Sequence, residues 1–217
     1  MSGASTSVAR ILITSGPTRQ YIDPVRYLTN ASSGRMGKAL AEAALARGHE
    51  VVIVSGPVDI TYPPAVKVIP VVSTEDMLAA ARLEFPHCDG LIGVAAPSDY
   101  RPVKVAANKI AKTGEPLTLH LVETDDVVAT LGAQKTKQWL VGFALETEDQ
   151  RLRALAKLEK KHCDLIVSNG PEAMHSLENS VEIIDRAGTV IETLSGPKEH
   201  VARGIFAVIE QRLIKRR

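Results

Sequence analysis

Residues 34–57 read GRMGKALAEAALARGHEVVIVSGP and predict a helix followed by a strand. The helix is expected over 34–47, which is rich in Ala and Leu, and it ends at Gly48 because glycine readily adopts the left-handed C-cap conformation. The strand is expected over 51–54, where β-branched residues dominate. A similar apolar run over 8–14 precedes the stretch and predicts a first strand, so the chain opens with a β-α-β unit.

The same alternation continues along the chain. Further strands are expected over 66–72, 90–95, 117–122, 140–144 and 165–168, and further helices over 75–84 (capped by Ser73 or Thr74), 126–132 and 148–161. Toward the end, 181–184 and 190–194 flank the turn at 185–188 and predict a hairpin, and a last helix is expected over 197–214. The sequence therefore predicts an α/β fold: one Rossmann-like, three-layer domain over 1–217, whose mostly parallel sheet has an antiparallel C-terminal hairpin. Residues 1–7 are expected to be flexible.

The bulk composition excludes several classes of function. The chain has 217 residues, of which 45% are hydrophobic and 24% charged, and its net charge is +1. This charge provides no global field for nucleic acid or for an anionic membrane, so any phosphate site must be local. No run has the length of a signal peptide or a membrane span, and a cytoplasmic location is expected.

The two cysteines and the other potential ligands suggest no metal centre. Cys88 and Cys163 are isolated and form neither a zinc motif nor a disulfide framework. They are expected to be small core residues in a reducing compartment. No histidine or carboxylate cluster resembles a metal cage, so no protein metal site is expected.

The segment after the first strand is the first candidate site, because ligands bind beyond the carboxyl ends of parallel strands. It contains SGPTR at 15–19 and TNASSGRMG at 29–37. A helix starting near Gly34 would offer free N–H groups and a positive dipole end to an anion. Ser32 or Ser33 can act as the N-cap, as an anion ligand, or as both.

One alternative is a nicotinamide-dependent reductase. The segment 29–37 is similar to the cofactor loop of short-chain dehydrogenases, and Tyr100 and Lys104 imitate their Tyr-x-x-x-Lys pair. However, a long polar segment separates this loop from the first strand, whereas a dinucleotide fingerprint follows its strand directly. Pro102 also argues against the helix that would bring Tyr100 and Lys104 together. A second alternative is a nucleotide-binding module without catalysis.

Four motifs together resemble the phosphopantothenoylcysteine synthetase family, which also occurs as the C-terminal half of a bifunctional flavoprotein of coenzyme A synthesis. The motifs are SGPTR at 15–19, VRYLTNASSGRMG at 25–37, AAPSDYRP at 95–102 and NKIAK at 108–112. The similarity extends from about Ile11 to the final helix. The resemblance does not include the flavin-binding half, so no FMN is expected.

The resemblance implies a ligase. Such enzymes activate 4′-phosphopantothenate with a nucleoside triphosphate, usually CTP in bacteria and ATP in eukaryotic relatives, and form an acyl-nucleotide and pyrophosphate. The cysteine amine then takes the acyl group. Mg²⁺ is expected to bind mainly through the phosphates and water, and a homodimer is expected, with 18–27 and the C-terminal hairpin as candidate contacts.

The resemblance also assigns residues to this chemistry. Asn30 and Lys109 match the catalytic positions, Asn30 at the acyl-nucleotide and Lys109 at the nucleotide and acyl transfer. The expected nucleotide-binding residues are Gly93, Val94, Ala95, Asp99, Lys109, Asp125, Asp126, Val127, Val128, Phe143, Lys157 and Lys161. The expected phosphate- or substrate-binding residues are Gly16, Thr18, Arg26, Ser32, Ser33 and Gly34.

Each assignment has an ordinary structural alternative. Asn30 is also a common turn residue, Arg26 and Lys109 are also ordinary surface cations, and Phe143 is also a core residue. Lys157 and Lys161 are four residues apart and share a helix face, but Lys160 lies on the same helix with no role implied by the resemblance. Pro97 and Ala111 depart from the family pattern, which leaves the choice between CTP and ATP open.

Overall fold

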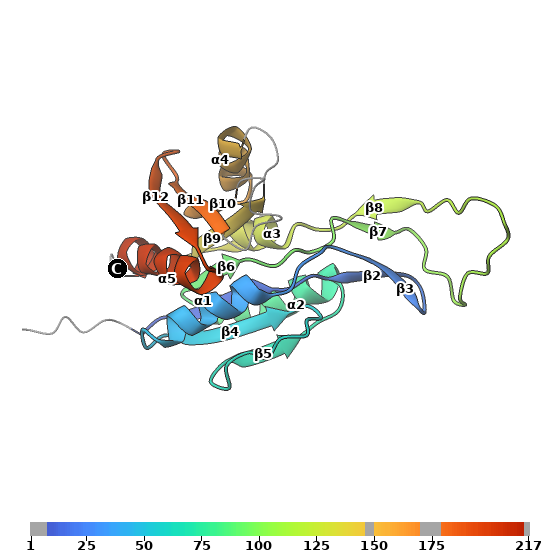
Figure 1. Cartoon of the computed structure of the whole chain (residues 1–217), viewed down its shortest axis with the longest axis horizontal. Helices are drawn as coiled ribbons and strands as arrows, with labels where there is room; N and C mark the ends of the chain where they lie inside the picture. Colours follow the sequence, from blue (N-terminus) through green and yellow to red (C-terminus); the bar gives the residue numbers. More distant parts are fainter. Residues whose placement is uncertain (1–7, 146–149, 170–178, 215–217) are drawn as a thin grey trace, which may run out of the picture.

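The computed structural model describes residues 8–145, 150–169 and 179–214 of the protein (Figure 1). Residues 1–7, expected to be flexible, and the first two residues of the helix expected over 148–161 lie outside these ranges.

A central sheet of eight strands runs through the described chain in the order β12-β11-β10-β9-β6-β1-β4-β5. The strands are β1 (Arg10–Ser15), β4 (Glu50–Ser55), β5 (Lys67–Pro70), β6 (Gly90–Gly93), β9 (Trp139–Leu145), β10 (Leu165–Asn169), β11 (Asn179–Asp185) and β12 (Val190–Gly196). In this sheet order, every pair of neighbouring strands between β10 and β5 is parallel, whereas the pairs β10-β11 and β11-β12 are antiparallel. The predicted parallel sheet with an antiparallel C-terminal hairpin is thus confirmed.

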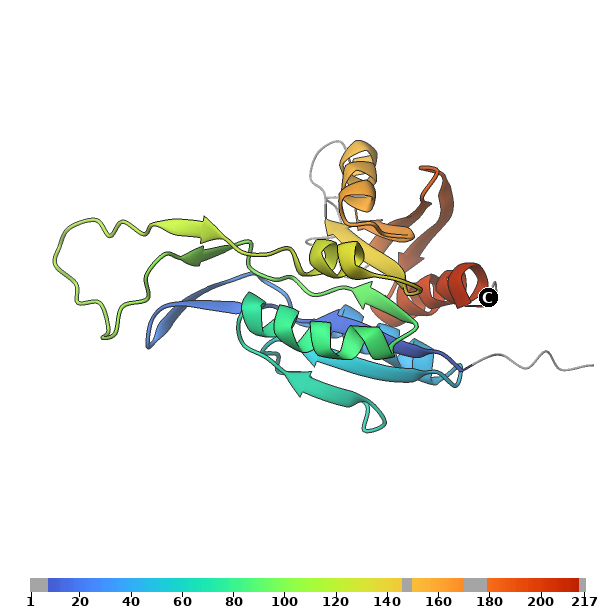
Figure 2. The same cartoon turned by 180° about the vertical axis from the view of Figure 1, so that it is seen from behind.

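Helices cover both faces of the sheet, which confirms the three layers (Figures 1 and 2). One face packs on α1 (Arg35–Leu45) and α5 (Lys198–Ile209), and the other packs on α2 (Thr74–Glu84), α3 (Val127–Gln134) and α4 (Gln150–Lys160). Successive strand residues serve opposite faces, as the pleat requires: Ile11 and Ile13 belong to the first core, and Leu12 to the second. In the described ranges, no helix combines the length and apolar character needed to cross a membrane.

The N-termini of α1 and α2 show which of the expected N-cap residues are correct. Ser73, one of the two caps that the sequence suggests, caps α2, and it also forms a capping box with Asp76. For α1 the expectation of a serine cap is wrong: the N-cap is Gly34, with φ of 72° and no side-chain cap. The chain enters this helix through a left-handed residue, a conformation that glycine adopts without strain, so the hydroxyls of Ser32 and Ser33 do not cap it.

Two hairpins extend from the sheet and were not predicted. They are β2 (Arg19–Asp23) with β3 (Arg26–Thr29), and β7 (Tyr100–Pro102) with β8 (Leu121–Glu123). We call residues 100–123 the arm, which projects from the body beside β2 and β3 (Figure 1). The strand expected over 117–122 shortens to β8, because only 121–123 find a pairing partner in β7.

A buried carboxylate ties the β2-β3 turn to the arm. Asp23 is fully buried and accepts hydrogen bonds from the amides of Val25 (2.9 Å), Arg26 (2.9 Å) and Ile110 (3.1 Å), and it forms an ion pair with the Arg26 guanidinium. Burial by itself would raise the pKa of Asp23, but the Val25 and Ile110 amides and Arg26 outweigh it and hold the pKa below its usual range.

Candidate active site

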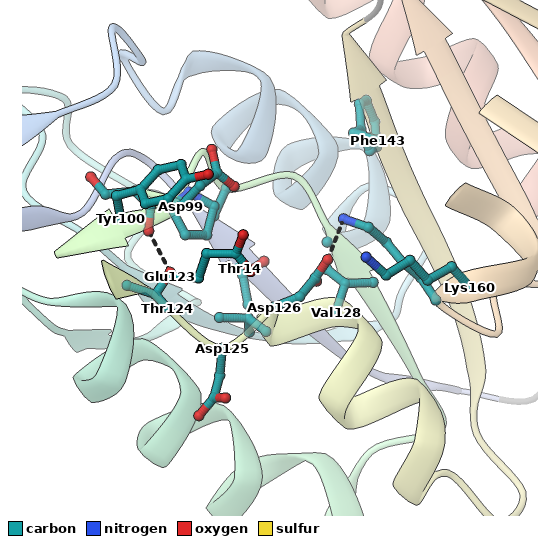
Figure 3. A pocket seen from close by; sticks show the side chains of 16 residues that line it. Thr14, Asp99, Tyr100, Glu123, Thr124, Asp125, Asp126, Val128, Phe143 and Lys160 are labelled. Carbon is teal, nitrogen blue, oxygen red and sulfur yellow. Dashed lines mark hydrogen bonds and ion pairs between the residues drawn. The ribbon is translucent and has the colours of Figure 1, made fainter. Parts of the chain in front are cut away.

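A cavity of about 290 Å³ opens at the carboxyl ends of β1, β6 and β9, the edge where parallel sheets bind ligands (Figure 3). Its walls come from these strand ends, the loop after β6, the β8-α3 turn and the end of α4. The lining residues are Thr14, Gly93, Ala95, Pro97, Ser98, Asp99, Tyr100, Glu123, Thr124, Asp125, Asp126, Val127, Val128, Phe143, Lys160 and Lys161.

Small residues let the end of β6 approach α3. A Cβ on Gly93 would lie 2.5 Å from Cγ2 of Val128, so no larger residue fits there without a shift. Asp126 caps α3 by accepting the Ala129 amide at 3.0 Å. The N-terminus of α3 therefore lies at the cavity, where its dipole favours negative charge.

Charges of both signs meet at this turn. The Lys161 ammonium lies 3.1 Å from Asp126, and Lys160 also lines the cavity (Figure 3). Burial acts to raise the pKa of Asp126, but the Ala129 amide and Lys161 outweigh it and hold the pKa below its usual range. The side chain is therefore a carboxylate at neutral pH, fixed between a helix start and a cation.

The lysine pair at the cavity differs from the one that the sequence suggests. Lys161 is there, but its companion is Lys160, whereas Lys157 is not among the lining residues. The Lys161 amide donates to the Lys157 carbonyl at 2.9 Å, one residue beyond the end of α4, so the last helical turn still relates the two lysines. Lys160 and Lys161 stand at the end of the helix, where His162, with φ of 53°, turns the chain, whereas Lys157 lies about one turn further from the cavity.

The loop after β6 is held by the predicted catalytic asparagine. Nδ2 of Asn30 donates to the carbonyl of Pro97 at 2.8 Å and to that of Ala96 at 3.4 Å. The Ala96 amide donates in turn to the carbonyl of Gly16 at 2.9 Å. Gly16, with φ of 75°, thus supports the loop through its backbone.

The other predicted substrate residues occupy three different places. Ser32, Ser33 and Gly34 line a second cavity of about 180 Å³ at the start of α1, to which Lys198 of α5 also contributes. Thr18 is fully buried behind the loop after β6. Arg26 pairs with Asp23 and donates to the carbonyl of Ile110 at 3.2 Å.

The second predicted catalytic residue lies apart from both cavities. Lys109 is exposed on the arm and lines neither of them. Val94 lines the second cavity, while Gly93, Ala95, Asp99, Phe143 and residues 125–128 line the first. Sequence reasoning missed Tyr100, Glu123 and Lys160 as lining residues, since no motif marks them individually.

Two further observations bear on the chemistry. Tyr100 begins a strand and not a helix, so the dehydrogenase-like spacing of Tyr100 and Lys104 does not place them on one helix face. Among the residues that the structure describes, no three His, Cys, Asp or Glu side chains are grouped to hold a metal ion.

The chain is similar to known proteins over nearly its whole length. The family model for the DNA/pantothenate metabolism flavoprotein C-terminal domain matches residues 6–213. The coenzyme A biosynthesis bifunctional protein CoaBC of Haemophilus influenzae is 38% identical over 205 residues, covering 93% of this chain and 51% of that protein. The Escherichia coli protein of the same name is 44% identical over 163 residues, covering 73% of this chain and 40% of that protein.

A solved structure agrees with these matches. The crystal structure of the C-terminal domain of a CoaBC protein is 40% identical and superposes with a TM-score of 0.81, covering 95% of this chain and 98% of that one. The chain spans about half the length of the curated relatives that it matches. It belongs to the family of DNA/pantothenate metabolism flavoprotein C-terminal domains.

Proposed function

We propose that this chain is a phosphopantothenate–cysteine ligase of coenzyme A biosynthesis. A carboxylate oxygen of 4′-phosphopantothenate attacks the α-phosphorus of a nucleoside triphosphate, CTP in preference to ATP, and pyrophosphate leaves. The nitrogen of cysteine then attacks the acyl carbon, loses its proton, and the nucleoside monophosphate leaves. The observation that carries the proposal is the family match over residues 6–213, together with relatives named for coenzyme A biosynthesis.

The geometry of the two cavities supports a nucleotide and an acidic substrate side by side. The first cavity offers a helix start, Lys160 and Lys161, which suit phosphates. Phe143 at the same cavity suits a base or ribose, and Asp99 can accept from their amino or hydroxyl groups. Ser32, Ser33 and Gly34 at the start of α1 suit the second anionic group.

Asn30, which lines neither cavity, is proposed as the first catalytic residue. Its Nδ2 already reaches the carbonyl of Pro97 on the wall of the first cavity. Once the longer of its two bonds, to the Ala96 carbonyl at 3.4 Å, is given up, the freed amide hydrogen can stabilise the charge that develops on the acyl oxygen during each transfer. Lys109 is proposed as the second catalytic residue, whose ammonium group stabilises negative charge on the phosphates.

Mg²⁺ fits this site as a companion of the nucleotide. Mg²⁺ commonly binds through one or two carboxylates and substrate phosphates and keeps several waters. Glu123 lines the first cavity and would supply such an oxygen, while Asp99 is proposed for the base or ribose and Asp126 is engaged by Lys161. The ion would neutralise charge on the phosphates.

We also propose that the enzyme acts as a homodimer in the cytoplasm. The arm carries exposed apolar side chains, among them Val103 (62% exposed), Val105 (52%) and Leu117 (58%), and such surfaces often mark interfaces. A second copy would also explain how Lys109, exposed on the arm, reaches a cavity. Cys88 and Cys163 are free, buried thiols, which suits a reducing compartment.

The test is pyrophosphate release by the purified protein with Mg²⁺ and 4′-phosphopantothenate, with CTP and ATP in parallel and with or without cysteine. Release that requires phosphopantothenate supports the ligase, and the faster nucleotide identifies the co-substrate. No release from folded protein with either nucleotide would contradict the proposal. NADPH binding or silent nucleotide binding would then distinguish a reductase from a non-catalytic module.

A further inference from the structure

Three residues from distant parts of the chain form a closed ring of hydrogen bonds behind the loop after β6. Oγ1 of Thr18 and Oγ1 of Thr74 are 2.9 Å apart. Oγ1 of Thr74 donates to the carbonyl of Ser98 at 3.1 Å, and the amide of Ser98 donates to Oγ1 of Thr18 at 2.8 Å. All three residues are at most 5% exposed.

The direction of each bond in the ring follows from the number of protons. A threonine hydroxyl carries one hydrogen, and that of Thr74 is directed to the Ser98 carbonyl. The hydroxyl of Thr18 must therefore donate to Thr74, while it accepts from the Ser98 amide. Each group gives one hydrogen bond to the next, so the removal of one hydroxyl leaves a buried partner unpaired.

The ring fixes two successive peptide groups of the cavity wall. The amide between Pro97 and Ser98 is held at its N–H by Thr18 and at its carbonyl by Asn30. The next peptide group is held at the Ser98 carbonyl by Thr74, and also by the Thr124 hydroxyl at 2.7 Å. Because peptide groups are planar, these contacts set the direction in which the chain continues to Asp99.

Thr74 stands out because it touches the loop but neither cavity. It is the first residue of α2, is 1% exposed and lines neither of the two cavities. It lies 56 residues from Thr18 and 24 from Ser98 in the sequence. Its hydroxyl joins the segment after β1, which leads to Asn30, to the loop that carries Asp99.

We infer that Thr74, with Thr18, is a positioning residue of the ligase site. It acts through Ser98: it holds the Ser98 carbonyl, which follows the peptide group whose Pro97 carbonyl Asn30 binds, and so it holds the backbone that presents Asp99, without touching the substrate or the nucleotide. This inference rests on the proposed function and extends it to a residue outside the cavities. Thr18, which the sequence assigns to substrate binding, shares this role because its hydroxyl is fully engaged in the ring.

The kinetic test compares Thr74→Val, Thr74→Ser, Thr18→Val and the double valine variant by pyrophosphate release. Valine keeps the shape and removes the hydroxyl, and we expect kcat/KM for the nucleotide to fall about tenfold, equivalent to about 1.4 kcal/mol. Thr74→Ser keeps the donor and stays within about twofold of the wild type. The double variant should lose no more than the worse single variant, because both belong to one ring.

The matched control is Thr136→Val. The Thr136 hydroxyl donates to Gln138 between α3 and β9, at the opposite edge of the sheet. Its removal lowers stability at most and leaves kcat/KM for the nucleotide unchanged. If Thr74→Val matches Thr136→Val in kcat/KM, or Thr74→Ser is as impaired as Thr74→Val, the positioning role is refuted.

A second measurement separates this inference from the proposed function. Amide hydrogen exchange resolved at the Ser98 N–H, for example by NMR, reports the ring and requires no activity. We expect faster exchange there in Thr74→Val and Thr18→Val, and wild-type exchange in Thr136→Val. If the wild type releases no pyrophosphate, the ligase proposal fails, and the exchange measurement alone tests whether the ring positions the loop. Unchanged protection of the Ser98 N–H in Thr74→Val would overturn that role.

Discussion

The side-chain amide of Asn30 lies 2.8 Å from the main-chain carbonyl of Pro97, which is 67 residues further along the chain. This contact joins the loop before α1 to the wall of the first cavity. It depends on a donor at Nδ2, because both of its partners, the carbonyls of Pro97 and Ala96, are acceptors.

Asn30→Asp replaces this donor by an acceptor of the same size. We expect kcat for pyrophosphate release to fall about 100-fold, because the carboxylate cannot donate to a developing negative charge. Steady-state release with saturating substrates measures this loss. Asn108→Asp, which makes the same change at an exposed site on the arm, is the control. Equal activity of the two variants would exclude a catalytic role for Asn30.

Lys109→Ala tests whether the arm supplies a catalytic residue. We expect it to lower kcat about 100-fold through the loss of phosphate-charge stabilisation, whereas Lys104→Ala, also exposed on the arm, stays within about twofold. Single-turnover pyrophosphate release separates this step from acyl transfer. Wild-type rates for Lys109→Ala would remove this residue from the mechanism.

Mixing Lys109→Ala with Asn30→Asp tests whether a second copy completes the site. If the two residues act across a dimer interface, exchange of subunits creates some sites with both intact residues, and activity reappears after mixing. If both act within one subunit, the mixture stays as inactive as its parts. Light scattering at the assay concentration checks that dimers are present.

Asp23→Asn tests the buried link between the β2-β3 turn and the arm. The native pKa of Asp23 lies below the ordinary carboxyl value, which is about 3.9. Its charge therefore stabilises the fold above that value, and this contribution is lost as the pH falls through the native pKa. Urea unfolding should give a lower midpoint for Asp23→Asn than for the wild type at pH 7, with a smaller difference in acid.

The control for this series is Asp59→Asn, which neutralises an exposed carboxylate. Its urea midpoint should follow that of the wild type across the same pH range. A gap between Asp23→Asn and the wild type that stays constant down to acid pH would show that the charge of Asp23 contributes nothing.

Both cysteines should resist modification in the native protein. Burial, the main cause in each case, raises the pKa of Cys88 to about 11 and that of Cys163 to about 12. At pH 8 hardly any thiolate exists, and thiolate is the reactive form. Titration with a disulfide reagent should detect no rapidly reacting thiol in the folded protein and 2 in denaturant. A rapid stoichiometric reaction in the folded state would contradict this.

Local and periodic patterns were enough to predict the main sheet. The helix at α1, the cap of α2 and the hairpin of β11 and β12 follow from residues close together in sequence. The family motifs indicated in addition which strand ends carry the site. These features depend on short-range propensity and on hydrophobic period, and both are present in the sequence itself.

Tertiary structure alone decided which cavity or which contact each of the predicted site residues belongs to. The Thr18-Thr74-Ser98 ring, the burial of Asp23 and the presence of Lys160 rather than Lys157 at the cavity all depend on contacts between distant segments. The hairpin of the arm was not predicted either, because its paired residues lie 19 to 23 positions apart in the sequence (Pro102 with Leu121, Tyr100 with Glu123). Residue type determines what a side chain can bind, but packing of remote elements determines what it meets.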